Sequence, residues 1–213
     1  MFIELVDALR CPNPHEESWL VVSATTLEAR HILEGVLGCP ICHAEYPVHD
    51  GIADFRREAD AALESSAASV LSALAPADHL AAMMNLADPL GFAVLTGRWS
   101  VRADELLELA DGPPLLLVDP PPEVRMRPGL SGIRSGLSLP LAAGAARGVA
   151  VDTTAPARIA SAANVTRVGG RLVAPASAPL PDGVRELARD AAIWVAEREA
   201  RPSALVTLHV RRG

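Results

Sequence analysis

The most informative absence from this 213-residue sequence is lysine, because all 19 basic side chains are arginine. Without an ε-amino group the chain can form neither a lysine Schiff base nor a lysine-dependent phosphate loop, which excludes the enzyme classes that rely on them. Aromatic residues are also scarce at 3%, so the 50% of residues that are hydrophobic must build a mainly aliphatic core. No apolar run approaches the roughly 18 residues that a membrane span requires.

Basic residues are also fewer than acidic residues. The 26 acidic residues outnumber the 19 arginines, which gives a formal net charge of −7 and a pI near 5.3. This balance argues against a broad basic face for nucleic acid, so any RNA contact would need a local patch or a partner. Glu4 and Asp7 stand where a signal peptide needs basic residues, and we therefore expect a soluble, cytoplasmic protein.

Only three cysteines are present, and two of them form a Cys-x-x-Cys pair. An odd number fits a reducing compartment and metal or thiol chemistry better than a disulfide framework. All three lie before residue 58, together with four of the six histidines, and the excess of acids over arginines shrinks after that point. We predict a small N-terminal module at 1–57, a helical linker at 58–76 and a larger domain at 77–213.

Hydrophobic patterns differ between these parts. The first module carries short strands at 19–22, 36–37 and 46–48 and a turn at 49–51, which cannot bury much of a core. In the larger domain, helices are expected at 78–87, 103–110, 157–166 and 184–200, and strands at 92–95, 115–118, 148–151, 171–174 and 205–210, with a turn at 169–170. This alternation predicts an α/β fold with a Rossmann-like, mostly parallel sheet and helices on both faces.

Four side chains of the first module have the spacing of a metal site: Cys11, His15, Cys39 and Cys42. Zinc prefers four soft or borderline ligands in a tetrahedron, and two short knuckles, Cys-x3-His and Cys-x2-Cys, supply two each. Such a closed site folds a module and does not catalyse, because no position is left for substrate. The fourth ligand has three alternatives to His15, which are His43, His31 and His49.

The run CPICH, residues 39–43, also matches the attachment motif of c-type haem. That attachment normally follows export, and it leaves the third cysteine unexplained. A thioredoxin-like redox pair is the other alternative, although this Cys-x-x-Cys does not open a helix after a strand.

Two stretches frame the first module, LVDALRCP from Leu5 and CPICHAEYPVHDGIADF up to Phe55. Their Cys-Pro start, Tyr-Pro-Val and Asp-Gly-Ile turn make residues 5–55 similar to the zinc-ribbon family that acts as activator subunit of tRNA, rRNA and release-factor methyltransferases. The first knuckle of that family is usually Cys-Pro-x-Cys. Here Pro14 stands at the second cysteine position, and His15 follows one residue later.

The middle of the larger domain carries a second resemblance. Residues 139–151 and the run RVGGRLV at 167–173 are similar to the fourth strand, the following helix and the Gly-Gly turn of class I S-adenosylmethionine-dependent methyltransferases. The resemblance implies that Asp119, at the end of an apolar strand, binds the ribose hydroxyls of the cofactor. A carboxylate can accept both hydroxyl hydrogens, although Asp119 equally suits the turn that Pro120 begins.

Several cofactor-facing features of that family are replaced. The Gly-x-Gly-x-Gly loop after the first strand is reduced to Gly97, and the bulky Arg98 and Trp99 that follow are expected to occupy the cofactor pocket. The acids usual around the fourth strand are replaced by neutral or basic residues, at Ser135-Gly136, Ala143 and Arg147. We therefore predict a degenerate methyltransferase-like domain, a pseudo-enzyme.

No catalytic group can be assigned. The fourth strand ends in Val151-Asp152-Thr153-Thr154 instead of an Asn-Pro-Pro-Tyr motif, and a lone acid such as Asp152 is more often a turn or cap residue than a base. His79 and His209 are isolated.

The sequence therefore predicts a zinc-binding accessory or scaffold protein that acts through protein–protein contacts. The N-terminal module would pack on its own second module or be exchanged in a homodimer. The positive mean hydropathy of +0.23 suits a surface buried against a partner. The alternative is an active S-adenosylmethionine-dependent methyltransferase with its zinc-ribbon activator fused in cis.

Overall fold

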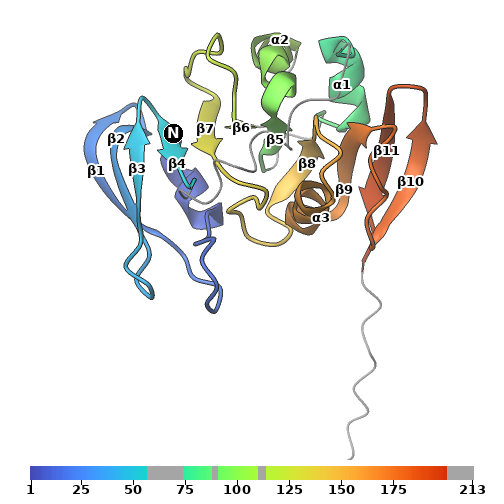
Figure 1. Cartoon of the computed structure of the whole chain (residues 1–213). Coiled ribbons are helices and arrows are strands. Elements are labelled where there is room, and N and C mark those ends of the chain that lie inside the picture. Colours follow the sequence, from blue (N-terminus) through green and yellow to red (C-terminus); the bar gives the residue numbers. More distant parts are fainter. Residues whose placement is uncertain (57–73, 88–90, 110–113, 201–213) are drawn as a thin grey trace, which may run out of the picture.

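An eleven-stranded sheet runs through the molecule (Figure 1), in the order β1-β2-β3-β4-β7-β6-β5-β8-β9-β11-β10. The computed structural model describes residues 1–56, 74–87, 91–109 and 114–200. The strands are β1 (Val21–Glu28), β2 (His31–Gly38), β3 (Glu45–His49), β4 (Ile52–Asp54), β5 (Ala93–Thr96), β6 (Leu115–Val118), β7 (Leu130–Arg134), β8 (Ala146–Ala150), β9 (Thr166–Pro175), β10 (Val184–Arg189) and β11 (Ile193–Arg198). The helices are η1 (Ile3–Ala8), α1 (Ala77–Met83), η4 (Gly97–Arg102), α2 (Ala103–Leu109) and α3 (Pro156–Val165), of which η1 and η4 are 3-10 helices.

The first four strands form an antiparallel meander, which confirms the short strands expected in this part of the sequence. Its tight turns contain residues in the left-handed backbone region, among them Ala29, Arg30 and the Asp50-Gly51 pair. β1 is almost entirely exposed, and the other meander strands bury only some of their side chains. The meander therefore depends on other parts of the chain, or on a bound ion, for much of its stability.

The five adjacent strands β7, β6, β5, β8 and β9 pair with one another in parallel. Numbered along the chain from β5, these strands have the spatial order 3-2-1-4-5, which reverses between β5 and β8. Every residue of β5 and β6 is buried, because both faces of the sheet are covered here. The expected α/β class, with a doubly wound, mostly parallel sheet, is confirmed.

Apolar clusters cover the two faces of this sheet. α1 and α2 belong to a cluster that includes Leu95, while α3 belongs to a second cluster that includes the adjacent Val94. The N-terminal η1 joins the second cluster through Leu5 and Val6, and Leu9 follows them into it. The N-terminal residues thus share a core with the central sheet.

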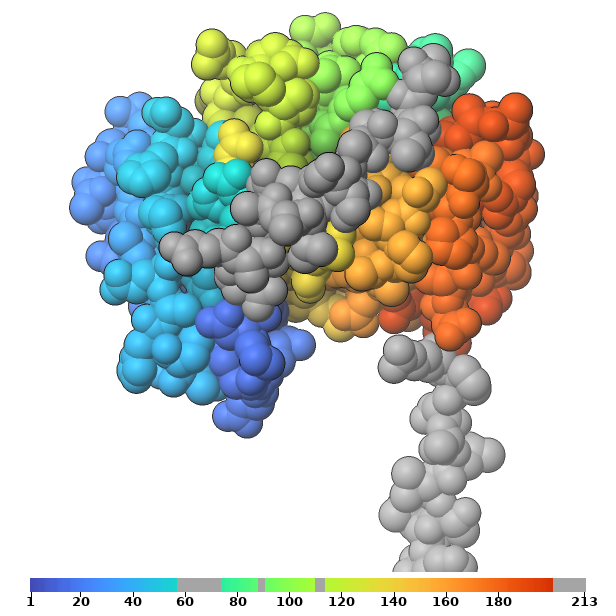
Figure 2. Space-filling view, in the orientation of Figure 1, coloured from blue at the N-terminus to red at the C-terminus, as the bar shows by residue number. Residues whose placement is uncertain are grey.

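β4 connects the meander to the central sheet by pairing in parallel with β7. The ladder has three residue pairs, and its middle pair, Ala53 and Ile133, is fully buried. In the space-filling view the N-terminal residues, coloured blue and cyan, pack directly against the rest of the molecule (Figure 2). The meander is therefore an extension of the sheet.

The helix predicted at 184–200 is wrong, because these residues form the β10–β11 hairpin. Asp190 Oδ1 accepts hydrogen bonds from the N–H groups of Ala192 and Ile193 at 2.7 and 2.8 Å, which closes the turn. β11 pairs with β9 and fully buries Trp194, whereas β10 lies at the sheet edge with most of its side chains exposed. An edge strand beside a buried strand produces a mixture of apolar and charged residues that resembles a helical pattern.

Two further details differ from the expectation. β7 lies in a stretch rich in proline and glycine that gives no strand pattern, and it is buried because β4 and β6 flank it. Gly169 and Gly170, expected as a turn, lie inside β9 at an irregularity of its pairing with β8. A side chain at Gly170 would place its Cβ 2.4 Å from the Arg147 carbonyl oxygen.

The other elements expected in the larger domain are confirmed. The helices at 78–87, 103–110 and 157–166 correspond to α1, α2 and α3, and the strands at 92–95, 115–118, 148–151 and 171–174 correspond to β5, β6, β8 and β9. Most of the predicted linker, residues 58–73, and the predicted strand at 205–210 lie outside the described residues. Within the described residues, no helix has the length and apolar character needed to cross a membrane.

Substitution of Leu9 tests the shared core. Leu9 is fully buried in the cluster that holds side chains of both the meander and the central sheet. Leu9→Ala should lower the free energy of unfolding by about 2–5 kcal/mol. In urea, tryptophan fluorescence and far-UV circular dichroism should report one transition at a lower midpoint.

The matched control is Leu187→Ala in β10, where the leucine is 39% exposed and little stability should be lost. Two separate transitions, only one of them displaced by Leu9→Ala, would contradict a shared core.

Candidate functional site

Cys11, His15, Cys39 and Cys42 come together beside the turn between β2 and β3. One ligand atom from each residue lies within 4.8 Å of the others. The structure thus assembles the four residues that the sequence spacing predicts as ligands. The cluster they form could hold a metal ion.

Two short loops position the ligand atoms. In the first, the Cys11 N–H donates to the Ser18 carbonyl at 3.3 Å and closes the loop that contains His15. In the second, the Cys39 N–H donates to the Ala44 carbonyl at 2.9 Å, and His43 takes the left-handed φ of 58° that the tight turn needs. Backbone hydrogen bonds therefore bring the ligands together.

Distances between the ligand atoms suit a tetrahedral site. Cys11 Sγ lies 3.7 Å from Cys42 Sγ, and His15 Nε2 lies 3.2 Å from Cys11 Sγ and 3.4 Å from Cys39 Sγ. Ordinary zinc bond lengths place tetrahedral ligand atoms about 3.8 Å apart for two sulfurs and about 3.6 Å apart for sulfur and nitrogen. The donor set therefore fits a four-coordinate ion with small adjustments.

A backbone contact orients the His15 ring. Its Nδ1 lies 2.6 Å from the Glu16 carbonyl oxygen, which can only accept, so Nδ1 carries the proton and donates. Nε2 then presents its lone pair to the cysteines, as in metal-bound histidines whose other nitrogen donates to a carbonyl. The three alternative histidines lie outside the cluster: His49 pairs with Glu34, His31 contacts the Ala29 carbonyl, and His43 is exposed.

The thiols differ in their electrostatic surroundings. Hydrogen bonds from the Asn13 side chain and from the Ala44 N–H lower the pKa of Cys42 to about 6. Burial raises the pKa of Cys11. Cys42 is also exposed and therefore reaches the thiolate form needed for metal binding most readily.

A second candidate site is the switch point between β5 and β8, because doubly wound sheets bind ligands there at the carboxyl ends of the strands. Asp152, just after β8, reaches across this point to the loop after β5. Its Oδ1 accepts a hydrogen bond from Thr96 Oγ1 at 3.0 Å, and its Oδ2 accepts one from the Arg98 N–H at 2.8 Å. The carboxylate thus holds the first turn of η4 from a distant part of the chain, and it does not cap the helix that follows it, α3, whose N-cap residue is Ala155.

Gly97 leaves the space that this carboxylate fills. A Cβ built at Gly97 would lie 2.2 Å from Asp152 Oδ2, and the glycine has a φ of 49°. The expectation that Arg98 and Trp99 occupy the pocket is wrong, because Arg98 is exposed and Trp99 is fully buried in the cluster of α1 and α2. The Trp99 indole N–H instead donates to the Val151 carbonyl at 3.2 Å.

Asp119, at the end of β6, has both carboxylate oxygens engaged. Arg158 of α3 donates to Oδ2 at 2.9 Å, and the Ser135 N–H donates to Oδ1 at 2.9 Å. The Arg158 side chain is only 5% exposed and also donates to the Gly136 carbonyl at 2.5 Å. Burial raises the pKa of the Asp119 carboxyl, and the Arg158 guanidinium opposes that rise.

The remaining candidates lie apart from these two sites. The Arg147 guanidinium is buried against the Asn85 carbonyl, His79 is exposed on α1, and His209 is outside the described residues. Sequence reasoning missed Arg158. The available signal was a single cation in α3, which otherwise consists of apolar and small polar residues.

No family model matches the chain, and no curated protein matches it. Similar solved structures are methyltransferases. A complex between the Haloferax volcanii Trm112 methyltransferase activator and a protein described as a methyltransferase is 18% identical over 46% of this chain and 50% of that chain, with a TM-score of 0.38. The matched region thus spans half of that chain.

Two further structures are similar at the same level. The antibiotic-resistance methyltransferase Kmr is 15% identical over 62% of this chain and 97% of that chain, with a TM-score of 0.39. The T. thermophilus 16S rRNA N2 G1207 methyltransferase RsmC, in complex with AdoMet and guanosine, is 15% identical over 98% of this chain and 49% of that chain, with a TM-score of 0.33. These low TM-scores assign neither a family nor an activity to this chain.

Substitution of His15 tests the metal cluster. Metal-free wild-type protein titrated with Co²⁺ should bind one ion per chain and develop the absorption bands of tetrahedral cobalt thiolate. His15→Ala should weaken binding roughly tenfold or more, because a ligand is lost. His49→Ala removes another candidate histidine, which is exposed in β3, and should bind like the wild type. Equal losses in the two variants, or octahedral spectra, would contradict the cluster as a metal site.

Proposed function

We propose that this protein is a zinc-binding accessory or scaffold protein whose methyltransferase-like domain, residues 77–213, does not bind S-adenosylmethionine. The observation that carries the proposal is the position of Asp152, whose carboxylate lies against Gly97 at the switch point of the sheet. The work of such a protein is binding, through a protein partner or a second copy of the chain.

Zinc is the ion we propose for the N-terminal module, residues 1–57. Three thiols and one imidazole form a soft to borderline donor set, and four protein ligands leave no open position for substrate. The meander buries few side chains of its own, so the free energy of zinc binding would contribute to its folding.

The cost of opening the switch point supports the loss of cofactor binding. A methionine moiety could enter only if Asp152 left, which would break its hydrogen bonds with Thr96 and Arg98. Each hydrogen bond to a charged group contributes about 1.5–3 kcal/mol. A ribose would further have to compete with Arg158 for Asp119.

The alternative function is an active methyltransferase with its activator in cis. One observation favours it, since Asp119 lies at the carboxyl end of β6, where the sequence resemblance expects the ribose-binding acid. In that case Arg158 and Asp152 would both have to move when the cofactor binds.

Calorimetry distinguishes the two functions. Zinc-replete protein should give no binding heat with S-adenosylmethionine or with its demethylated product, and zinc analysis of the same sample should give one ion per chain. Asp119→Ala should change neither result, because Asp119 would serve structure alone.

If the wild type binds S-adenosylmethionine with micromolar affinity and Asp119→Ala does not, this proposal is wrong and the alternative function, an active methyltransferase, is supported. Asp182→Ala, which removes the negative charge of an exposed aspartate, is the control for nonspecific loss of charge.

A further inference from the structure

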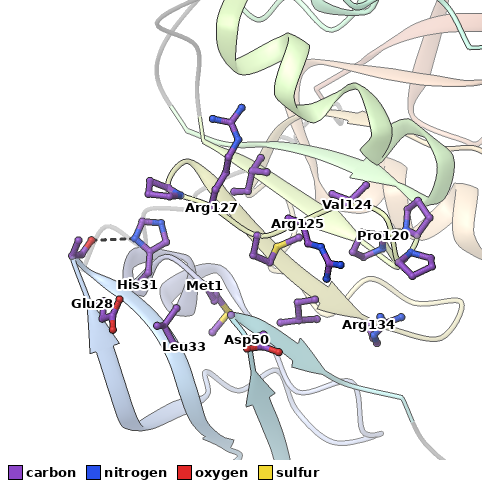
Figure 3. A pocket seen from close by; sticks show the side chains of 18 residues that line it. Met1, Glu28, His31, Leu33, Asp50, Pro120, Val124, Arg125, Arg127 and Arg134 are labelled. Atoms are coloured by element: carbon purple, nitrogen blue, oxygen red, sulfur yellow. Dashed lines mark hydrogen bonds between the residues drawn. The ribbon is translucent and has the colours of Figure 1, made fainter.

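A groove of about 630 Å³ lies between the meander and the loop at 120–128, which follows β6 (Figure 3). The turns β1–β2 and β3–β4 form one wall, and the loop with the start and end of β7 forms the other. Its volume is within the range of about 300–1,000 Å³ that small-molecule sites occupy. The groove lies beside β4 and β7, two strands away from the switch point, and its lining includes Pro120, the residue that follows Asp119.

The loop wall is built into the structure. The Val124 N–H donates to the Pro121 carbonyl at 3.0 Å, and the Leu130 N–H donates to the Arg127 carbonyl at 2.9 Å. Met126 lies over Gly132 of β7, where an added Cβ would be 3.1 Å from its sulfur. Val124 and Met126 also pack against the apolar cluster of α1 and α2. The wall is therefore formed before any ligand binds.

Apolar side chains line much of the groove. Leu33 and Ile52 contribute from the meander side, and Val124, Met126 and Leu130 contribute from the loop side together with four prolines. Proline has no N–H to donate, so these residues suit an apolar body rather than a polar one. A ligand that fills the groove must therefore carry apolar surface.

The charges of the groove are separated. Arg125 and Arg134 lie toward the Pro120 end, as Figure 3 shows, whereas Glu28 and His31 lie at the opposite end. Within the described residues neither Arg125 nor Arg134 forms an ion pair. Arg127, the third arginine, is already paired with Asp104 at 2.6 Å.

Arg125 has no acidic partner among the described residues, whereas Arg134 lies beside Asp54 in the β4–β7 ladder and its positive charge also acts on the Asp119 carboxyl. We propose that this groove binds an amphipathic anion, an apolar chain or ring that carries one carboxylate or phosphate. The anionic group binds Arg125 and Arg134, and the apolar part lies along Ile52, Val124 and Met126. Asp50 on the meander wall faces this end of the groove and opposes a negative charge there.

The test is calorimetric titration of the full chain with octyl phosphate and octanoate, two probes with alkyl chains of similar length and different anionic groups. Inorganic phosphate and octanol are the matched controls for charge and for chain. Octyl phosphate or octanoate should bind one site per chain, and each control should bind at least tenfold more weakly. The tighter of the two probes identifies which anionic group the site prefers.

Variants locate the site. Arg125→Ala removes an exposed side chain without disturbing the core and should weaken the preferred probe roughly tenfold or more, since a charged hydrogen bond is lost. Asp50→Asn removes the opposing charge and should tighten binding. Arg185→Ala, an exposed arginine of β10, should bind like the wild type.

Several results would overturn the proposal. Neither probe binding at millimolar concentration would show that the groove is no such site. Equal binding by wild type and Arg125→Ala would place the probe elsewhere. If inorganic phosphate binds as tightly as octyl phosphate, the alkyl chain contributes nothing to binding and the groove is not a site for an amphipathic ligand. S-adenosylmethionine binding with no competition from octyl phosphate would contradict only the proposed function and leave the groove intact.

Discussion

The parallel pairing of β4 with β7 is the contact on which the rest of the structure depends. It extends the doubly wound sheet into the meander, and its central residues Ala53 and Ile133 are fully buried. The same arrangement brings η1 under the sheet, where its apolar residues complete the core beside α3. A meander with so few buried side chains depends on this pairing for much of its order.

At the carboxyl edge of the parallel strands, two aspartates are bound by groups of the same chain. Asp152 caps η4 across the switch point, and Asp119 is held by the buried Arg158. The first contact joins the end of β8 to η4, and the second joins the end of β6 to α3, so both hold the loops at this edge in place. The open groove lies where the two parts of the chain meet.

Local sequence patterns predicted much of this structure. The strand at 115–118 was predicted from its unbroken apolar run, and the helix at 103–110 from the helical spacing of its apolar residues. The cluster of candidate metal ligands was predicted from the spacing of Cys11, His15 and the Cys-x-x-Cys pair. β7 and the β10–β11 hairpin were not predicted, because each is stabilised by pairing with a strand that is distant in the sequence. The contact of Asp152 with the Gly97 loop spans 55 residues and leaves no local pattern.

Amide hydrogen exchange across β4 and β7 tests most directly whether the meander and the central sheet form one body. In the zinc-loaded protein the hydrogen-bonded amides of β4 and β7 should exchange as slowly as those of β5 and β6, through opening of the whole fold. Rapid exchange in β4, with β5 and β6 still protected, would show that the meander opens independently. That result would contradict a structure organised by the β4–β7 pairing.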